Sequence, residues 1–331
     1  VKAKGANTTW AAKQLAQYCD QKGIPDDHVI VSTADVDSSF HKQYFSILTY
    51  KFITSPDRLQ CGYQPVAMYF NNIWGASLLS RVMAFGTTFW QLIESIRAYR
   101  LVTFATHSMA LSTLKKIDYW CISIVNEDSR QYFRSWFYFD GNFRVVPLFI
   151  PLFMDAVLVD GAWATFKNLY LQQQRWAYGV EHFPYIVLEC ARHPRIPWRA
   201  RTAQIFRAFS GTYSWATSAF FITFVGWLPL ILNPRFQEHV AASYFPIVTQ
   251  VLLSITWVGL LISGLITLKL LNIVQHNKRP IELSTMILQW LLSPIASIFL
   301  GALPGIDAQT RLMFGRYMGF RVTEKSASKQ K

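Results

Sequence analysis

HVIVSTADVD, residues 28–37, is a short apolar run that ends directly on two acidic residues. Isoleucine, valine and threonine favour strands, so we predict a strand here with Asp35 and Asp37 at its carboxyl end. Open α/β sheets hold their ligands at that end of their strands. Residues 8–22 and 40–53 have the apolar spacing of helices, which together with the strand predicts an α/β fold.

The composition of the chain is that of a protein in contact with a membrane. Of its 331 residues, 52% are hydrophobic and 15% charged, against roughly 25% charged in soluble domains. The net charge is +13, but the basic residues lie beside the apolar segments rather than along one periodic face. This disfavours nucleic acid as a partner. Membrane lipids with anionic headgroups and a nucleotide diphosphate explain the charge better.

Cysteine and histidine spacing argues against a zinc site or a disulfide framework. The four cysteines show no C-x-x-C spacing, and the seven histidines form no H-x-x-x-H pair. Reduced thiols are typical of a domain on the cytoplasmic side. The cysteines are Cys19, Cys61, Cys121 and Cys190.

Three uncharged stretches, 208–234, 240–268 and 283–306, predict membrane helices. Each exceeds the roughly 20 apolar residues that cross a bilayer; the alternative is three buried helices of a soluble protein. A basic amphipathic segment at 191–207 precedes them and suits the headgroup region. Because basic residues favour the cytoplasmic side, the tail 307–331 is expected there. Pro294 and Gly301 leave open whether the third stretch crosses or re-enters.

Three short motifs carry candidate chemistry. Asp35 and Asp37 can share a divalent cation such as Mg²⁺ or Mn²⁺, which also binds phosphates; the alternative is a solvated acidic turn. Glu127 and Asp128 follow an apolar run, where a carboxylate can accept a proton from an attacking hydroxyl. The alternative is an ordinary helix start with Asn126 as its cap.

The third motif is the pentapeptide QQQRW at residues 172–176. Arg175 supplies a fixed cation suited to a departing diphosphate. Trp176 offers a flat surface on which a sugar ring can stack. The alternative is a helix with a polar face and a buried tryptophan.

In this order, the motifs resemble those of the processive family 2 glycosyltransferases, the cellulose, chitin and hyaluronan synthases. In that family D-x-D, T-E-D and Q-x-x-R-W line one GT-A active site, and membrane helices follow. Here Asn126 replaces the threonine of T-E-D. The resemblance implies a GT-A (Rossmann-like) catalytic domain over residues 1–190, cytoplasmic, with its first strands missing from the chain. The interval from Glu127 to Gln172 is long for a synthase, which suggests a divergent subgroup with a different acceptor.

Two further segments match the family. KAKGAN at 2–7 looks like its K-A-x-x-x-N segment, which implies that Lys2 and Asn7 lie on the nucleotide side. FRVTEK at 320–325 matches the F-x-V-T-x-K gating motif, which implies that Thr323 and Lys325 close over the nucleotide.

The resemblance implies an inverting transfer from a nucleotide-sugar donor, expected to be a UDP-sugar, to a glycan or lipid-linked acceptor. The protein would be an integral, multi-pass membrane protein, and an accessory subunit stays open as a partner. A transferase that adds a single sugar and a non-catalytic membrane scaffold remain alternatives. The implied roles are the metal site for Asp35 and Asp37, the general base for Asp128 with Glu127 beside it, diphosphate binding for Arg175, and acceptor binding for Gln172 and Trp176.

Overall fold

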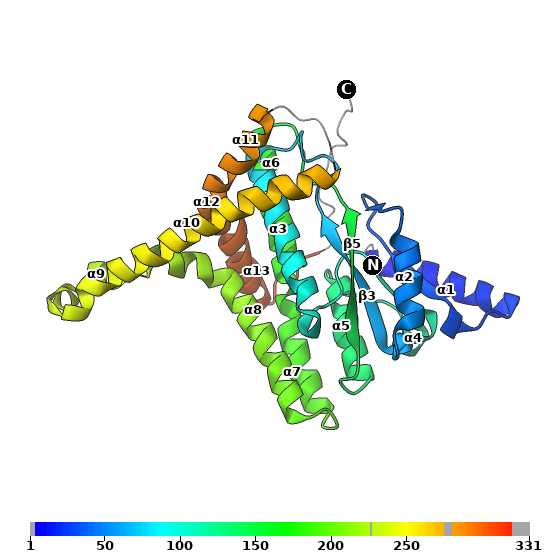
Figure 1. The fold of residues 1–331 in the computed structure, drawn as a ribbon. Coiled ribbons are helices and arrows are strands. Elements are labelled where there is room, and N and C mark those ends of the chain that lie inside the picture. The colour runs from blue at the N-terminus through cyan, green and yellow to red at the C-terminus, as the bar shows by residue number, and fades with distance from the viewer. Residues whose placement is uncertain (1–3, 226, 275–279, 320–331) are drawn as a thin grey trace.

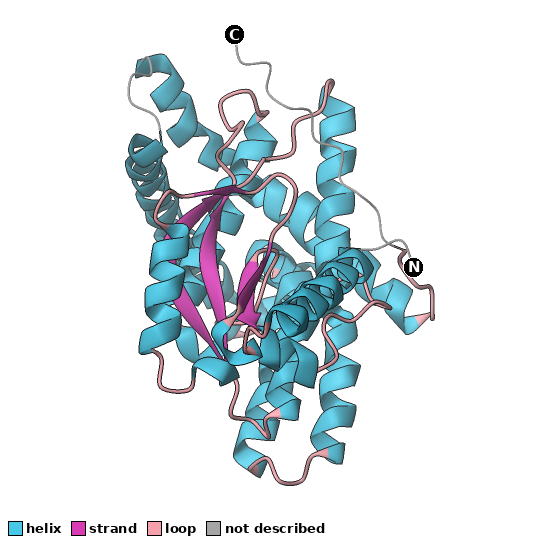
Figure 2. Ribbon diagram, turned by 90° about the vertical axis from the view of Figure 1, so that its right-hand side faces the viewer, coloured by secondary structure: helices cyan, strands magenta, loops and turns pink. Residues whose placement is uncertain are grey.

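The computed structural model describes residues 4–225, 227–274 and 280–319 (Figure 1). It has a mixed α/β architecture, in which a five-stranded sheet is surrounded by helices (Figure 2). The C-terminal helices lie to one side of the sheet (Figure 1). α9 (Leu228–Leu232) and the start of α10 (Val240–Val274) lie farthest from it, whereas the end of α10 returns to pack in the apolar cluster of β3 and α3. The predicted α/β class is therefore confirmed.

The strand order in the sheet is β1-β4-β3-β5-β2. The two long strands, β3 (Cys61–Met68) and β5 (Arg144–Phe153), run parallel in its centre. β4 (His107–Ala110) is antiparallel to β3 and to β1 (Ile30–Thr33). β1 confirms the strand predicted before Asp35, although it is shorter than the apolar run.

β5 contains Pro147 and Pro151, from which the sequence predicts an edge strand or an irregular loop. β5 lies between β3 and β2 (Ser39–Phe40), but within the described residues β2 pairs only with Leu152 and Phe153. Its register against β3 shifts between Gln64 and Val66, opposite the prolines. The prediction is therefore wrong, because β5 is a regular strand inside the sheet order. The prolines are tolerated because β2 pairs with only the last two residues of β5.

The helices that the sequence predicts around the sheet are present, but their bounds differ from those expected. The amphipathic stretch 71–105 predicts a mostly helical segment, but α3 covers only its middle, because residues 71–77 form turns and residues 101–106 form a loop before β4. The apolar run 120–125 is a loop rather than a regular element. The helices are α1 (Lys4–Lys22), α2 (Tyr44–Thr54), α3 (Leu78–Ile96), α4 (Leu111–Lys116), α5 (Glu127–Tyr138), α6 (Ala162–Ala177) and α7 (His182–Arg192), with 3₁₀ turns at Asp26–His28, Arg58–Gln60, Ala98–Arg100 and Tyr178–Glu181.

The first C-terminal helix, α8 (Trp198–Phe224), joins the predicted basic segment to the first apolar stretch. The boundary drawn at residue 207 therefore falls inside a helix. Two later segments, Tyr244–Leu271 and Glu282–Met313, are long and apolar enough to cross a bilayer by length and composition. The predicted stretch 208–234 is not one of these segments; it is divided between the end of α8 and the short helix α9.

The second of these segments is helical but irregular. It comprises α11 (Pro280–Leu288), a 3₁₀ turn (Gln289–Leu292), α12 (Ser293–Ala296), a π turn (Ser297–Ala302) and α13 (Leu303–Met313). It packs on the α/β part, where the ring of Trp290 stacks on Phe89 of α3 with centroids 5.4 Å apart. Trp290 thereby joins the apolar cluster that holds Phe70 and Phe85.

Candidate functional site

The turn after β1 presents Asp35 and Asp37. It is closed by the Ser38 amide, which donates to the Asp35 carbonyl at 3.0 Å, and it leaves the Val36 side chain fully exposed. Asp35 is more than a solvated turn residue, because its Oδ1 lies 2.5 Å from Nζ of Lys4 in α1. Lys4 belongs to the KAKGAN segment, but the sequence does not single it out.

The backbone of a single residue, Ala105, connects Lys4 to Asp128. Nζ of Lys4 donates to the Ala105 carbonyl at 2.8 Å, and the Ala105 amide donates to Oδ2 of Asp128 at 2.8 Å. Gln64 of β3 fixes this loop, because its side chain accepts from the Phe104 amide at 2.9 Å and donates to the Thr106 carbonyl at 3.0 Å. The distance between the two acidic motifs is therefore set by the backbone of the loop at residues 104–106, which Gln64 holds against the sheet.

Glu127 and Asp128 form the first turn of α5, as the helix-start alternative predicts. Asn126 does not cap the helix with its side chain, which instead donates to the Arg175 carbonyl at 3.3 Å. The Ser129 amide donates to Oδ1 of Asp128 at 2.7 Å. Both oxygens of Asp128 therefore accept a backbone N–H, and the carboxylate has a fixed orientation.

Charge in the site is balanced around Lys4. Burial would lower the pKa of Lys4, but Asp35, Asp128 and Glu127 together raise it above its ordinary value. Glu127 is buried, and this burial together with the neighbouring Asp128 raises its pKa well above the usual range, with Lys4 opposing. Lys4 thus remains charged beside these carboxyl groups, whereas Glu127 keeps its proton to a higher pH than an ordinary glutamate.

Gly5 allows α1 to approach α5 closely. A Cβ at this position would overlap the Cys121 carbonyl oxygen and come within 3.2 Å of Cγ of Glu127. Backbone oxygen cannot turn aside as a flexible side chain can. The packing of Gly5 therefore keeps Lys4, one residue earlier, within reach of Asp35 and the Ala105 carbonyl.

The pentapeptide lies in the last two turns of α6. Gln172, Gln173 and Gln174 are buried, whereas Arg175 and Trp176 are half-buried. The Trp176 ring lies 6.1 Å from the ring of Tyr69, the residue after β3.

Tyr69 stands close to all three motifs. Its pKa is raised by burial and then by Asp35, Asp37 and Asp128, with Arg175 opposing. The sequence offers no signal for this tyrosine beyond its place at a strand end.

One large cavity, of about 1990 Å³, contains the candidate residues. It continues from the carboxylates along α3, α8 and the irregular segment, where Trp215, Ser218, Trp290 and Ser297 line it. Lys2, Thr323 and Lys325 lie outside the described residues. The predicted site residues that line the cavity are Asn7, Asp35, Asp37, Glu127, Asp128, Gln172, Arg175 and Trp176.

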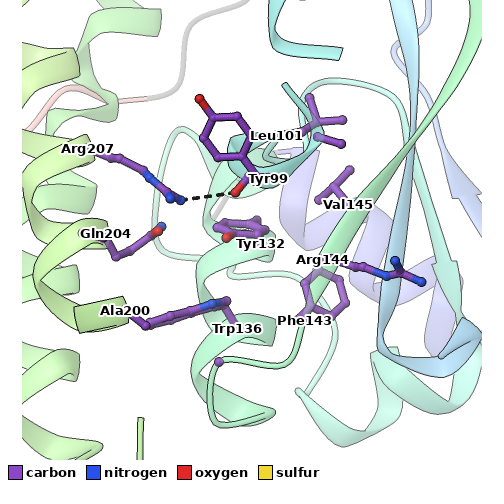
Figure 3. A pocket seen from close by; sticks show the side chains of 13 residues that line it. Tyr99, Leu101, Tyr132, Trp136, Phe143, Arg144, Val145, Ala200, Gln204 and Arg207 are labelled. Carbon is purple, nitrogen blue, oxygen red and sulfur yellow. Dashed lines mark hydrogen bonds between the residues drawn. The ribbon is translucent and has the colours of Figure 1, made fainter. Parts of the chain in front are cut away.

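A second cavity, of about 200 Å³, lies where α8 meets α5 and the start of β5 (Figure 3). Tyr132, Trp136 and Phe143 provide an aromatic lining. Arg207 donates to the Tyr99 carbonyl at 3.3 Å, and its guanidinium lies 5.5 Å from the centre of the Tyr99 ring. Arg207 lines both cavities, so the basic start of α8 faces the large cavity as well as this pocket.

The residues at the D-x-D turn fit a divalent cation only in part. Among the residues described here, no group of three or more His, Cys, Asp or Glu side chains can hold a metal. Mg²⁺ commonly uses one or two carboxylates and completes its shell with water and substrate phosphates. Asp35 and Asp37 fit that pattern, and a metal here would depend on a phosphate-bearing ligand.

The last described residues run beside the acidic motif. The Tyr317 hydroxyl donates to the Ser123 carbonyl at 3.1 Å, and its ring lies 6.1 Å from Tyr178, just after the pentapeptide. Residues 320–325, which hold the gating-like motif, follow immediately and lie outside the described part.

No protein-family model matches the chain, and comparison with curated proteins finds no similar sequence. The resemblance to family 2 glycosyltransferases therefore depends on the motifs and on where they lie.

Proposed function

We propose that this protein is an inverting membrane glycosyltransferase that moves a sugar from a nucleotide-sugar, expected to be a UDP-sugar, to a growing polysaccharide or lipid-linked acceptor. The observation that supports this most directly is that the D-x-D, E-D and Q-x-x-R-W residues, far apart in sequence, line one cavity around Tyr69. A GT-A fold for residues 1–190 is part of the proposal, since the sheet itself shows only a mixed α/β arrangement.

Asp128 is the general base. Its two oxygens each accept one backbone N–H, which leaves further lone pairs for the acceptor hydroxyl. As the acceptor oxygen attacks the anomeric carbon, its proton passes to Asp128. The bond from that carbon to the diphosphate breaks, and the electron pair leaves with the diphosphate. One displacement inverts the anomeric configuration.

Positive charge for the leaving group comes from Arg175 and Lys4, both of which line the cavity. Asp37 and Asp35 would hold Mg²⁺ or Mn²⁺, which when bound neutralises charge on the diphosphate. Gln172 and Trp176 position the acceptor, with the indole as a stacking surface. Asn7 lies on the nucleotide side, together with Lys2.

The apolar helices support the membrane part of the proposal. Two segments have the length and composition of bilayer-crossing helices, and the cavity continues beside one of them. The proposed protein is multi-pass, and its catalytic domain is cytoplasmic. After transfer, the extended acceptor leaves through the part of the cavity that α8 lines. Thr323 and Lys325 close over the donor nucleotide.

Nucleotide release tests the proposal. Membranes that carry the full-length protein are given UDP- and GDP-sugars with Mn²⁺ or with a chelator, beside membranes that lack the protein. We expect metal-dependent release from one donor, and product length then separates a polymerising enzyme from one that adds a single sugar. Absence of release from every donor, in a protein that is folded in the membrane, would contradict the proposal and favour a scaffold.

A further inference from the structure

Buried polar contacts connect the turn that carries Asp128 to the start of α7. Oγ of Ser129 lies 2.8 Å from Nε2 of His182, and Nε of Arg130 donates to Nδ1 of the same ring at 3.1 Å. His182 and Arg130 are 7% and 8% exposed. These contacts therefore form in an interior where an unsatisfied polar atom is costly.

The donor and the acceptor of each of these hydrogen bonds can be assigned. A guanidinium can only donate, so Nδ1 of His182 must accept and the ring hydrogen must lie on Nε2. Burial, with Arg130 adding to it, lowers the pKa of His182 far below its ordinary value, which keeps the ring neutral. Nε2 therefore donates to Ser129, whose hydroxyl hydrogen is left to face Oδ1 of Asp128 at 3.5 Å or the Asn126 carbonyl at 3.4 Å.

The far end of this chain of donors is also fixed. Arg130 donates to the Glu181 carbonyl at 3.3 Å, and its guanidinium lies 3.9 Å from the centre of the Tyr185 ring. Burial raises the pKa of the Glu181 carboxyl, and Arg130 and the backbone at Asn126 and Val125 oppose that rise. The residues directly after the pentapeptide thus hold the loop and helix turn that present Asp128.

We propose that Ser129 and His182 are positioning residues, which orient the Asp128 carboxylate towards the acceptor hydroxyl. Ser129 acts on Asp128 through its own amide and hydroxyl, and His182 acts through Ser129. This inference rests on the proposed function, because it assigns a role in the same transfer reaction. Its specific content is that the geometry of the base depends on α7 and not on α5 alone.

Ser129→Ala is the first test, because it removes only one hydroxyl. We expect kcat to fall about 10-fold to 100-fold, as a displaced catalytic group does, with the donor KM changed less than about 2-fold. Ser129→Thr keeps a hydroxyl and should restore most of the rate. Ser135→Ala is the matched control on the same helix, since the buried Ser135 hydroxyl donates only within the helix, to the Gln131 carbonyl at 2.8 Å; it should leave kcat unchanged.

His182→Gln is the second test. Its amide can donate to Ser129 and accept from Arg130, so it should retain more activity than His182→Leu, with thermal unfolding and nucleotide binding measured to show that each variant is folded. Full kcat in Ser129→Ala, or an equal loss in Ser135→Ala, would overturn the positioning role while the transferase stands. A wild-type protein that releases no nucleotide from any donor would overturn both.

Discussion

The two walls of the large cavity are built in different ways. The wall from α1, the β1 turn and α5 is charged, and its groups are held by short contacts such as Lys4–Asp35 and Ala105–Asp128. The wall from α8 and the irregular segment 280–313 presents small and aromatic side chains, among them Trp215 and Ser297. Hydrogen bonds and ion pairs between individual atoms fix the geometry of the first wall, whereas the packing of apolar surfaces fixes the geometry of the second.

One carboxylate connects the apolar wall to α6, the helix that carries the pentapeptide. Asp307 of α13 accepts from Gln174 and from the Tyr170 hydroxyl of α6, the latter at 3.3 Å, and pairs with Arg311 at 2.8 Å. The helix of the pentapeptide is therefore attached to the apolar segment by a polar contact. The comparison predicts that substitutions on the charged wall have larger effects than substitutions on the apolar wall.

The largest effect is expected at Asp128. Asp128→Asn should lower nucleotide release by about 10²-fold to 10⁴-fold, because the amide cannot accept the acceptor's proton. Donor binding should persist, since the side chain keeps its shape. Asp118→Asn is the control, because that side chain is 84% exposed and lies 3.7 Å from Lys13 at the surface. A full rate in Asp128→Asn would remove the residue from the chemistry.

Gly5→Ala and Gly259→Ala compare a closely packed glycine of the charged wall with an open glycine of α10. At Gly5 a Cβ meets the Cys121 carbonyl, so we expect a loss of about 1–3 kcal/mol in stability, as for other overpacked sites, together with reduced turnover. At Gly259 of α10 a Cβ meets nothing within 4 Å, so stability should be kept or rise. Thermal unfolding of both variants measures the difference. Equal tolerance at the two glycines would refute the close approach of α1.

Asp307→Ala breaks the polar contact between α13 and α6. The Gln174 amide and the Tyr170 hydroxyl lose their acceptor, so we expect a destabilisation of about 1–2 kcal/mol. Asp160→Ala, an exposed aspartate in the loop before α6, is the matched control. Unfolding in detergent measures both. If the two variants unfold alike, apolar packing alone holds α13 on α6.

The smallest effect is a dependence of stability on pH. Burial lowers the pKa of His107 to about 3, with Lys4 adding to the effect. At a pH below the ordinary pKa of histidine, the unfolded chain takes up a proton on His107 that the folded chain does not. The stability that His107 contributes is therefore fully present above about pH 6.5 and falls as the pH decreases. The contribution of His107 should decrease by about 1 kcal/mol between about pH 6 and about pH 5.

Unfolding at these two pH values tests this dependence. His107→Gln keeps an acceptor for the Trp120 indole, which donates to Nε2 of His107 at 3.1 Å, and it should show a shallower slope than the wild type. His28→Gln, at an exposed position, should keep the wild-type slope. An unchanged slope in His107→Gln would mean that this histidine titrates alike in both states.

Local signals were enough for some parts of the fold. The β-branched run before Asp35 predicted β1, and the Asn-Glu-Asp sequence marked the start of α5. The helix weighed as the alternative for the pentapeptide is α6. β4 could not be predicted from the sequence, because its four residues are all buried and show no alternation of apolar and polar side chains. The extent of α3 was wrong because an apolar helical pattern continues into a loop that β3 holds through Gln64.

The sequence by itself determined which chemical groups the protein brings, namely paired carboxylates, an arginine beside a tryptophan, and apolar segments of membrane length. Tertiary structure alone decided how they meet. Lys4 pairs with Asp35 across 31 residues and with the Ala105 carbonyl across 101, and Ser129 meets His182 across 53. Contacts of this kind depend on how sheet and helices pack, which short-range propensity does not encode.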